Sequence, residues 1–177
     1  MSDIDTWLAS FRTRAATLSG ARLPWLAAVR QRAIERFADE GWPTSRVEAF
    51  RHTSLAFLAQ QRFVAAQPAD ATAAAVQQAI AQLRRDDPEG HWLVFVDGVF
   101  APALSEQGDL PAGAQVGPLS QALAQWPERV EAAFGSADDG ASPVALNAAL
   151  ATDGAWVWLP RASAVELPIH LVFLTAT

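Results

Sequence analysis

The side chains that could perform acid–base or metal chemistry are few in this sequence, and they are widely separated. The histidines are His52, His91 and His170, which with Asp97 or Glu48 could in principle bind a metal ion. No two of them have the i,i+4 spacing that places two ligands on one face of a helix. The simpler interpretation is structural: His52 lies in a capped turn, His91 starts a strand and His170 lines a strand face.

The acidic and nucleophilic side chains give no catalytic arrangement either. Glu128 and Glu131 lie three residues apart in a stretch with helical periodicity, so we interpret them as a surface pair and not as an acid–base couple. Ser136 follows Gly135, but the G-x-S-x-G pattern of hydrolases is absent, as is the G-x-G-x-x-G of dinucleotide-binding proteins. We therefore predict no catalytic residue, no metal ligand and no cofactor bound by this chain.

Missing residue types exclude several further kinds of chemistry. The sequence has no Cys, no Lys and no Tyr, and all 13 basic side chains are Arg. Without Cys there is no disulfide, no thiolate nucleophile and no cysteine-ligated zinc or iron–sulfur cluster. Without Lys there is no P-loop lysine and no Schiff base. The residues themselves therefore indicate a scaffold or an interaction module.

The charge is acidic overall and unevenly distributed. The chain of 177 residues has a net charge of −6, which argues against a general nucleic-acid binder. Residues 1–62 carry 9 Arg and 6 acidic side chains, whereas residues 63–177 carry 4 and 13. The basic first third could dock an acidic partner, or it could be an ordinary solvated helix face. No apolar run approaches the ~20 residues of a membrane helix and no signal peptide is evident, so we predict a cytoplasmic protein without a membrane segment.

The periodicity of the apolar residues predicts helices over 4–18 and 24–40. Gly41 suits a left-handed position just past the second helix, with Trp42 folding back on Phe37. Ser45 and Glu48 have the spacing of a capping box that opens a short helix. We therefore predict an N-terminal helical subdomain over residues 1–63.

A mixed helix and strand segment is predicted over residues 71–151, after a small-residue linker at 64–70. Residues 92–96 are typical of a buried strand, and Asp97-Gly98 is a strong hairpin signal. Pro127 divides two helical stretches, and Ser142-Pro143 opens another. The remaining elements of this segment are a helix over 72–85, a strand over 114–119, and helices over 120–126, 127–134 and 142–151.

The last segment, residues 154–177, contains two stretches, 155–160 and 165–174, that are apolar on both strand faces. Because they are too close for a helical crossover, they predict the first rungs of a right-handed parallel β-helix. We expect this domain to be interrupted at Thr177 and its open end to self-associate. The fold class is therefore predicted as α+β with a truncated β-helix.

Three stretches of the sequence, in order, match known motifs. Residues 41–55, GWPTSRVEAFRHTSL, resemble the G-x-P-T-x-x-x-E-x-W-[KR]-Y-T-x-L pattern near the start of SufD-type members of the SufB/SufD family of iron–sulfur cluster assembly proteins. Residues 95–100, FVDGVF, resemble a V-F-V-N-G stretch. Residues 145–171 resemble an L-N-x-A … D-G … P … P-I-H-[IL] pattern at the entry to the family's β-helix. The motif residues, expected to be structural or docking residues, are Gly41, Pro43, Thr44, Arg46, Glu48, Phe50, Arg51, His52, Thr53, Asn147, Gly154 and Pro168.

The resemblance implies a non-catalytic scaffold that acts with a SufB-like scaffold and a SufC-like ATPase, the iron–sulfur cluster being assembled by the intact complex. Phe50 stands where the family usually has Trp, and His52 where it has Tyr; both keep a flat ring for packing. The family's β-helix continues beyond this sequence, so we expect an N-terminal fragment. The alternative, from another class, is the start of a β-helix enzyme that acts on carbohydrate.

Overall fold

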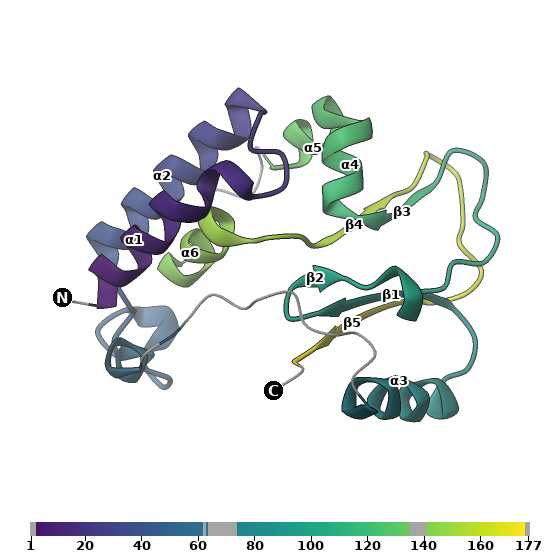
Figure 1. Cartoon of the computed structure of the whole chain (residues 1–177), viewed down its shortest axis with the longest axis horizontal. Coiled ribbons are helices and arrows are strands. Elements are labelled where there is room, and N and C mark those ends of the chain that lie inside the picture. The colour runs from purple at the N-terminus through teal and green to yellow at the C-terminus, as the bar shows by residue number, and fades with distance from the viewer. Residues whose placement is uncertain (1–2, 62, 64–73, 135–140, 176–177) are drawn as a thin grey trace. The chain divides into compact units, whose positions relative to one another are not determined.

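The computed structural model describes residues 3–61, 63, 74–134 and 141–175 (Figure 1). The chain forms two compact units, each built from two separate stretches. Unit 1 contains Met1–Ala65 and Trp126–Ala151, and unit 2 contains Ala66–Gln125 and Thr152–Thr177. Helices and small sheets are both present, so the predicted α+β class is confirmed. The grouping differs from the three predicted segments, because residues 126–151 belong with the N-terminal helices.

Unit 1 is built on three helices, α1 (Asp3–Arg14), α2 (Pro24–Glu40) and α6 (Ser142–Leu150). A 3-10 turn, η1 (Ala15–Thr17), and a short loop connect α1 to α2, and the two helices lie side by side (Figure 1). The apolar stripes predicted from the sequence face one shared core. Small side chains on α6 let that helix approach closely, which explains why it joins this unit. The buried members of this core are Phe11, Ile34, Phe37, Leu146 and Ala149.

The end of α2 confirms one prediction and corrects another. The Gly41 N–H donates to the Phe37 carbonyl at 2.8 Å, and the Trp42 ring packs edge-on against Phe37 at 5.1 Å between centroids, as expected. Gly41 has the expected positive φ of 63°, but its ψ of −161° is not that of a left-handed helical residue. This conformation belongs to a region that is essentially restricted to glycine.

No helix opens at Ser45, so the predicted capping box is wrong. Residues after Pro43 form turns, a 3-10 helix η2 (Glu48–Phe50) and a second one, η3 (Ala56–Gln60). The hydroxyl of Thr44, not Ser45, accepts the local backbone bond, from the Arg46 N–H at 3.2 Å. A serine or threonine that bonds two residues ahead forms a turn, which competes with a helical start.

Unit 1 also includes α5 (Pro127–Phe134), which begins at the proline expected to divide two helices. Its last residue, Phe134, packs against Trp25 in the first turn of α2, with 5.8 Å between ring centroids. The linker predicted at 64–70 and Ser136 lie outside the described residues.

Unit 2 contains a three-stranded sheet in the order β2 (Val99–Phe100), β1 (His91–Val96), β5 (Ile169–Leu174). The β1–β2 pair is the predicted hairpin. Asp97 and Gly98 both have positive φ, 48° and 77°, as a type I′ turn requires. On the other side β1 pairs in parallel with β5, from His91 opposite Ile169 to Val96 opposite Leu174. This parallel pairing was not predicted.

Strand β1 is buried on both faces, as predicted from its apolar run. On one face Val94 and Val96 pack with Val76 and Ile80 of helix α3 (Ala74–Asp86) and with residues near the 3-10 turn η4 (Pro102–Leu104). On the other face Leu93 and Phe95 pack with Val116. The central strand therefore joins two apolar clusters into the core of unit 2.

A second, two-stranded sheet pairs β3 (Gln115–Pro118) with β4 (Ala155–Trp158) in antiparallel register, and α4 (Leu119–Gln125) follows β3 directly. The expectation that β4 and β5 are buried on both faces is wrong for the described chain. Trp158 is exposed, and the side chains of Leu171 and Phe173 are 47% and 61% exposed. Both strands lie at the edges of their sheets, which explains this exposure: β4 is hydrogen-bonded to β3, and β5 to β1. One face of β5 is covered and the other is open. β-Helix rungs are not confirmed.

Candidate functional site

The first motif, residues 41–55, forms a closed and largely exposed loop. The Leu55 N–H donates to the Pro43 carbonyl at 2.9 Å, which closes the loop at its base. Inside it, short-range backbone bonds link Val47 to Thr44 and Phe50 to Val47 at 3.0 and 2.8 Å. Pro43 is buried, whereas residues 44–49 and 51–54 are exposed. The loop is thus ordered by its own backbone more than by burial of its side chains.

The polar side chains of this loop interact with one another. Arg51 lies 3.3 Å from the Glu48 carboxylate, and its Nε–H donates to Nε2 of His52 at 3.0 Å. His52 is exposed, so the expectation that its ring serves packing is wrong; Phe50 is half-buried. Thr53 contributes its backbone N–H to the Phe50 carbonyl at 3.0 Å. These contacts can order a docking surface but offer no proton-transfer couple.

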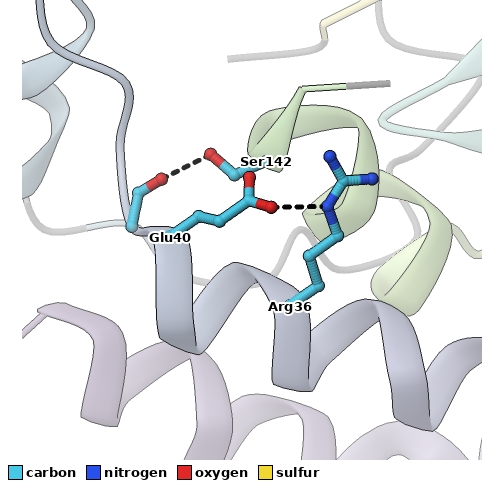
Figure 2. Close-up of polar contacts among 4 residues, drawn as sticks. Arg36, Glu40 and Ser142 are labelled. Carbon is cyan, nitrogen blue, oxygen red and sulfur yellow. Dashed lines mark hydrogen bonds and ion pairs between the residues drawn. The ribbon is translucent and has the colours of Figure 1, made fainter. Parts of the chain in front are cut away.

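A contact remote in sequence joins this motif to α6, the helix on which the third stretch, residues 145–171, begins. The Ser142 hydroxyl, at the start of α6, donates a hydrogen bond to the Gly41 carbonyl, beside the Arg36–Glu40 ion pair on α2 (Figure 2). Ser142 is buried, so this bond holds the start of α6 against the end of α2. Asn147 is exposed on the same helix. Unit 1 therefore contains the motif residues from Gly41 to Thr53 together with Asn147.

The remaining motif residues, Gly154 and Pro168, lie in unit 2 and act through their backbones. The Gly154 carbonyl accepts a hydrogen bond from the Leu119 N–H at 2.6 Å. The Pro168 carbonyl accepts one from the His91 N–H at 2.8 Å, which starts the β1–β5 pairing. Within the described chain these two positions have structural roles.

Sequence reasoning missed three residues that hold these backbones in place. Asp153 accepts hydrogen bonds from the Ser120 N–H, the Ser120 hydroxyl and the Gly154 N–H, at 2.8, 2.7 and 2.9 Å. Ser105 accepts the Val94 N–H at 3.0 Å and donates to the Ala101 carbonyl at 2.9 Å. Gly90 has a φ of 141° and lies against His170. An Asp before a glycine is a recognisable turn signal, but its partner across the fold is not encoded locally.

The three histidines are divided between the two units. His52 is in unit 1, and His91 is buried in unit 2, where its Nδ1 accepts the Gly108 N–H at 3.1 Å. His170 stacks on Trp92 at 4.3 Å between centroids and donates from Nε2 to the Glu89 carbonyl at 3.0 Å. No group of three His, Asp or Glu side chains among the described residues is placed to hold a metal ion.

Within the described part of the chain, the buried guanidinium with a shifted pKa belongs to Arg30, which is only 5% exposed. Its Nη2 donates to the Ser19 carbonyl at 2.8 Å, and its Nε and Nη1 have no hydrogen-bond partner. Burial lowers the pKa of the Arg30 guanidinium from its ordinary value, because desolvation disfavours the charged form. Arg30 is not part of any of the three motif stretches.

Glu128 and Glu131 are both exposed on α5, as predicted.

Across the described residues, no helix is both long and apolar enough to cross a bilayer.

Comparisons with known proteins point to the same family as the motifs. The family model described as the SufBD protein N-terminal region matches residues 1–171. The Iron-sulfur cluster assembly SufBD family protein slr0076 of Synechocystis sp. is 32% identical over 177 residues. That alignment covers 98% of this chain but only 38% of the relative, so the chain spans about two fifths of the relative's length. Because the family model matches nearly all of it, this chain belongs to the SufBD family.

Proposed function

We propose that this chain is the N-terminal part of a SufD-like scaffold subunit in a SUF-type iron–sulfur cluster assembly system. The observation that carries the proposal is the family match along residues 1–171. The printed name of the Synechocystis relative points to the same process. In this proposal the iron–sulfur cluster is cargo assembled by the intact complex, and the chain is not an enzyme. A β-helix enzyme acting on carbohydrate is not favoured by this family match.

The proposed partners are a SufB-like scaffold and a SufC-like ATPase, in the cytoplasm. The residue composition supports this division of roles. Without Cys the chain offers no thiolate for a cluster, and without Lys it offers no P-loop lysine for a nucleotide. Both activities would then belong to other parts of the complex. The ordered and exposed loop at 43–55 supports a docking role for the first motif.

Co-purification tests the proposal. The full-length protein that contains this chain is expressed with the SufB-like and SufC-like proteins of the same genome. We expect one complex containing all three proteins, and we expect deletion of the gene to lower the activity of iron–sulfur enzymes in the cell. A protein that co-purifies with neither partner, and whose loss leaves those enzymes at full activity, would refute the scaffold role.

We further propose that β4 and β5 open the right-handed parallel β-helix. The parallel pairing of β5 with β1 and the open, uncharged outer face of β5 support this proposal. In a longer protein that carries the proposed next coil, that coil would cover Leu171 and Phe173. Because the chain has no Cys, single Leu171→Cys and Phe173→Cys variants report this directly through thiol labelling. Labelling should be slow in the extended protein and fast in the 177-residue chain; equal rates would argue against a covering coil.

The same open edge is the proposed cause of self-association in the 177-residue chain. Light scattering should show association that disappears when Phe173 is changed to Lys, because a charge blocks pairing between strand edges. A change of the exposed Val144 on α6 to Lys is the matched control. If both variants associate like the original chain, the edge of β5 is not responsible.

A further inference from the structure

The connected end of the α1–α2 hairpin carries positive charge that nothing in its own stretch of sequence balances. Residues 6–34 contain five Arg and no Asp or Glu. The acidic residues of both helices lie at the other end, in the first turn of α1 and the last turns of α2. The hairpin therefore has an acidic open end and a basic connected end. Four of these five Arg residues, Arg12, Arg14, Arg22 and Arg30, make up what we call the basic end. The fifth, Arg32, lies further along α2.

The excess of positive charge at this end is not a property of unit 1 as a whole. Unit 1 contains ten Arg and ten acidic side chains, whereas unit 2 contains three and nine, so the whole net charge of −6 falls on unit 2. The basic character predicted for the first third of the chain is thus balanced once residues 126–151 are added. What remains is a local concentration at one end of a hairpin.

Helix electrostatics explain only part of this concentration. Arg12 and Arg14 lie in the last turn of α1, where cations interact favourably with the helix dipole. Arg22 lies between the helices and gains nothing from that effect. Asp39 and Glu40 lie in the last turn of α2, where the dipole disfavours carboxylates.

Among the residues that the structure describes, the guanidinium groups at the basic end have no ionic partner. None of Arg12, Arg14 and Arg22 makes an ion pair within the described ranges, and Arg12 and Arg22 are exposed. The neighbouring helix α5 brings two carboxylates and one guanidinium to unit 1, on Glu128, Glu131 and Arg129, and its carboxylates form no ion pair with these three Arg side chains.

Arg30 adds an independent observation at the same end. It donates one hydrogen bond to Ser19, in the connection between the helices, and two of its nitrogens remain without partners. A buried cation without a counter-charge is costly, and a nearby negative charge would lower that cost. The basic end therefore combines exposed guanidinium groups with a buried one. An approaching anion would stabilise all of these cations.

We propose that this basic end is a docking surface for an acidic segment of another protein. Guanidinium groups pair with carboxylates through two parallel hydrogen bonds, so Arg side chains suit such a segment. A nucleic acid or an anionic membrane presents dense negative charge over a much larger area than a peptide segment does. The net negative charge of unit 2 would repel such a surface. This inference goes beyond the proposed function and does not depend on it.

The test measures binding of a fluorescently labelled oligo-glutamate peptide to the 177-residue chain by anisotropy, at low and high salt. The chain should bind the peptide, and salt should weaken the binding. Combined Arg12→Gln, Arg14→Gln and Arg22→Gln changes should weaken it about tenfold or more. The matched control is Arg36→Gln, Arg85→Gln and Arg161→Gln, which removes the same charge outside the basic end and outside the motif loop and should change binding less than about threefold.

Three outcomes would overturn the proposal. These are no peptide binding by the chain, equal weakening by the two triple variants, and tighter binding to duplex DNA or phosphatidylserine vesicles than to the peptide. If circular dichroism shows that the first triple variant is unfolded, the single Arg22→Gln variant is tested in its place. It alters only the exposed connection, and it should weaken binding about threefold; unchanged binding would contradict the proposal.

Discussion

Both units are built from two stretches of chain that are far apart in the sequence, but different interactions join the stretches. In unit 1, α6 is attached by side chains: Leu146 and Ala149 enter the core formed by α1 and α2. In unit 2, β5 is attached by a parallel backbone ladder to β1, which begins at the Pro168 carbonyl. We infer that unit 1 tolerates changes that preserve side-chain volume, whereas unit 2 is most sensitive to changes in backbone geometry.

The largest loss is expected at the turn that leads into the backbone ladder. At Gly90, with a φ of 141°, an added Cβ would lie 2.5 Å from Cδ2 of His170 and 2.7 Å from the Pro168 carbonyl oxygen. Gly90→Ala should therefore lower the free energy of unfolding of unit 2 by about 3 kcal/mol, through strain and overlap together. Urea denaturation followed by tryptophan fluorescence measures this loss. Gly108→Ala is the control, because its Cβ would meet nothing closer than 3.6 Å; equal losses would refute the explanation.

A smaller loss is expected in unit 1 from Gly41→Ala. The φ of 63° and ψ of −161° are disfavoured for any residue with a Cβ, but the nearest atom, Cδ1 of Ile4, would be at an ordinary 3.6 Å. Backbone strain alone should cost about 2 kcal/mol. The same urea experiment gives this value, and an unchanged midpoint would mean that α2 does not end as described.

Removal of the hydrogen bond between α6 and α2 should have a modest effect. Ser142→Ala leaves the Gly41 carbonyl without its buried donor and should destabilise unit 1 by about 1 kcal/mol. Thermal unfolding measures the shift, and Ser10→Ala on α1 is a control of the same chemistry on a residue that donates no such bond to α6. If Ser142→Thr, which keeps the hydroxyl, is as unstable as Ser142→Ala, the bond is not the cause.

The smallest effect is expected at Arg30, and it should have the opposite sign. Arg30→Met removes a buried charge with two unpartnered nitrogens and keeps a long apolar side chain, so stability should stay the same or rise by about 1 kcal/mol. Denaturation in urea at constant salt gives the change. A loss above about 3 kcal/mol would mean that the guanidinium is well compensated in the fold.

The sequence predicts the local elements well wherever the signal is itself local. The stripes of α1 and α2, the Asp97-Gly98 hairpin and the division at Pro127 follow from periodicity and turn chemistry within a few residues. The pairing of β5 with β1 could not be predicted, because the two strands are distant in sequence and apolar strands do not specify their partners.

The candidate site was predicted less completely for the same reason. The motif residues were found by resemblance, but their contacts depend on distant groups. Ser142 meets Gly41, and Asp153 meets Ser120, across separations that no local pattern encodes. The capping box failed because Thr44 competes with Ser45 for the same turn. His52 was expected to pack because of its ring, whereas exposure is decided by the loop that carries it.

The central claim is that the chain contributes a scaffold and does not itself hold the cluster. Anaerobic reconstitution of the 177-residue chain with iron and sulfide, followed by iron analysis after desalting, tests it most directly. We expect iron far below one equivalent per chain, with no visible charge-transfer absorption, because no thiolate is available and no group of three possible ligands occurs among the described residues. Near-stoichiometric iron that remains bound to the isolated chain would contradict the claim.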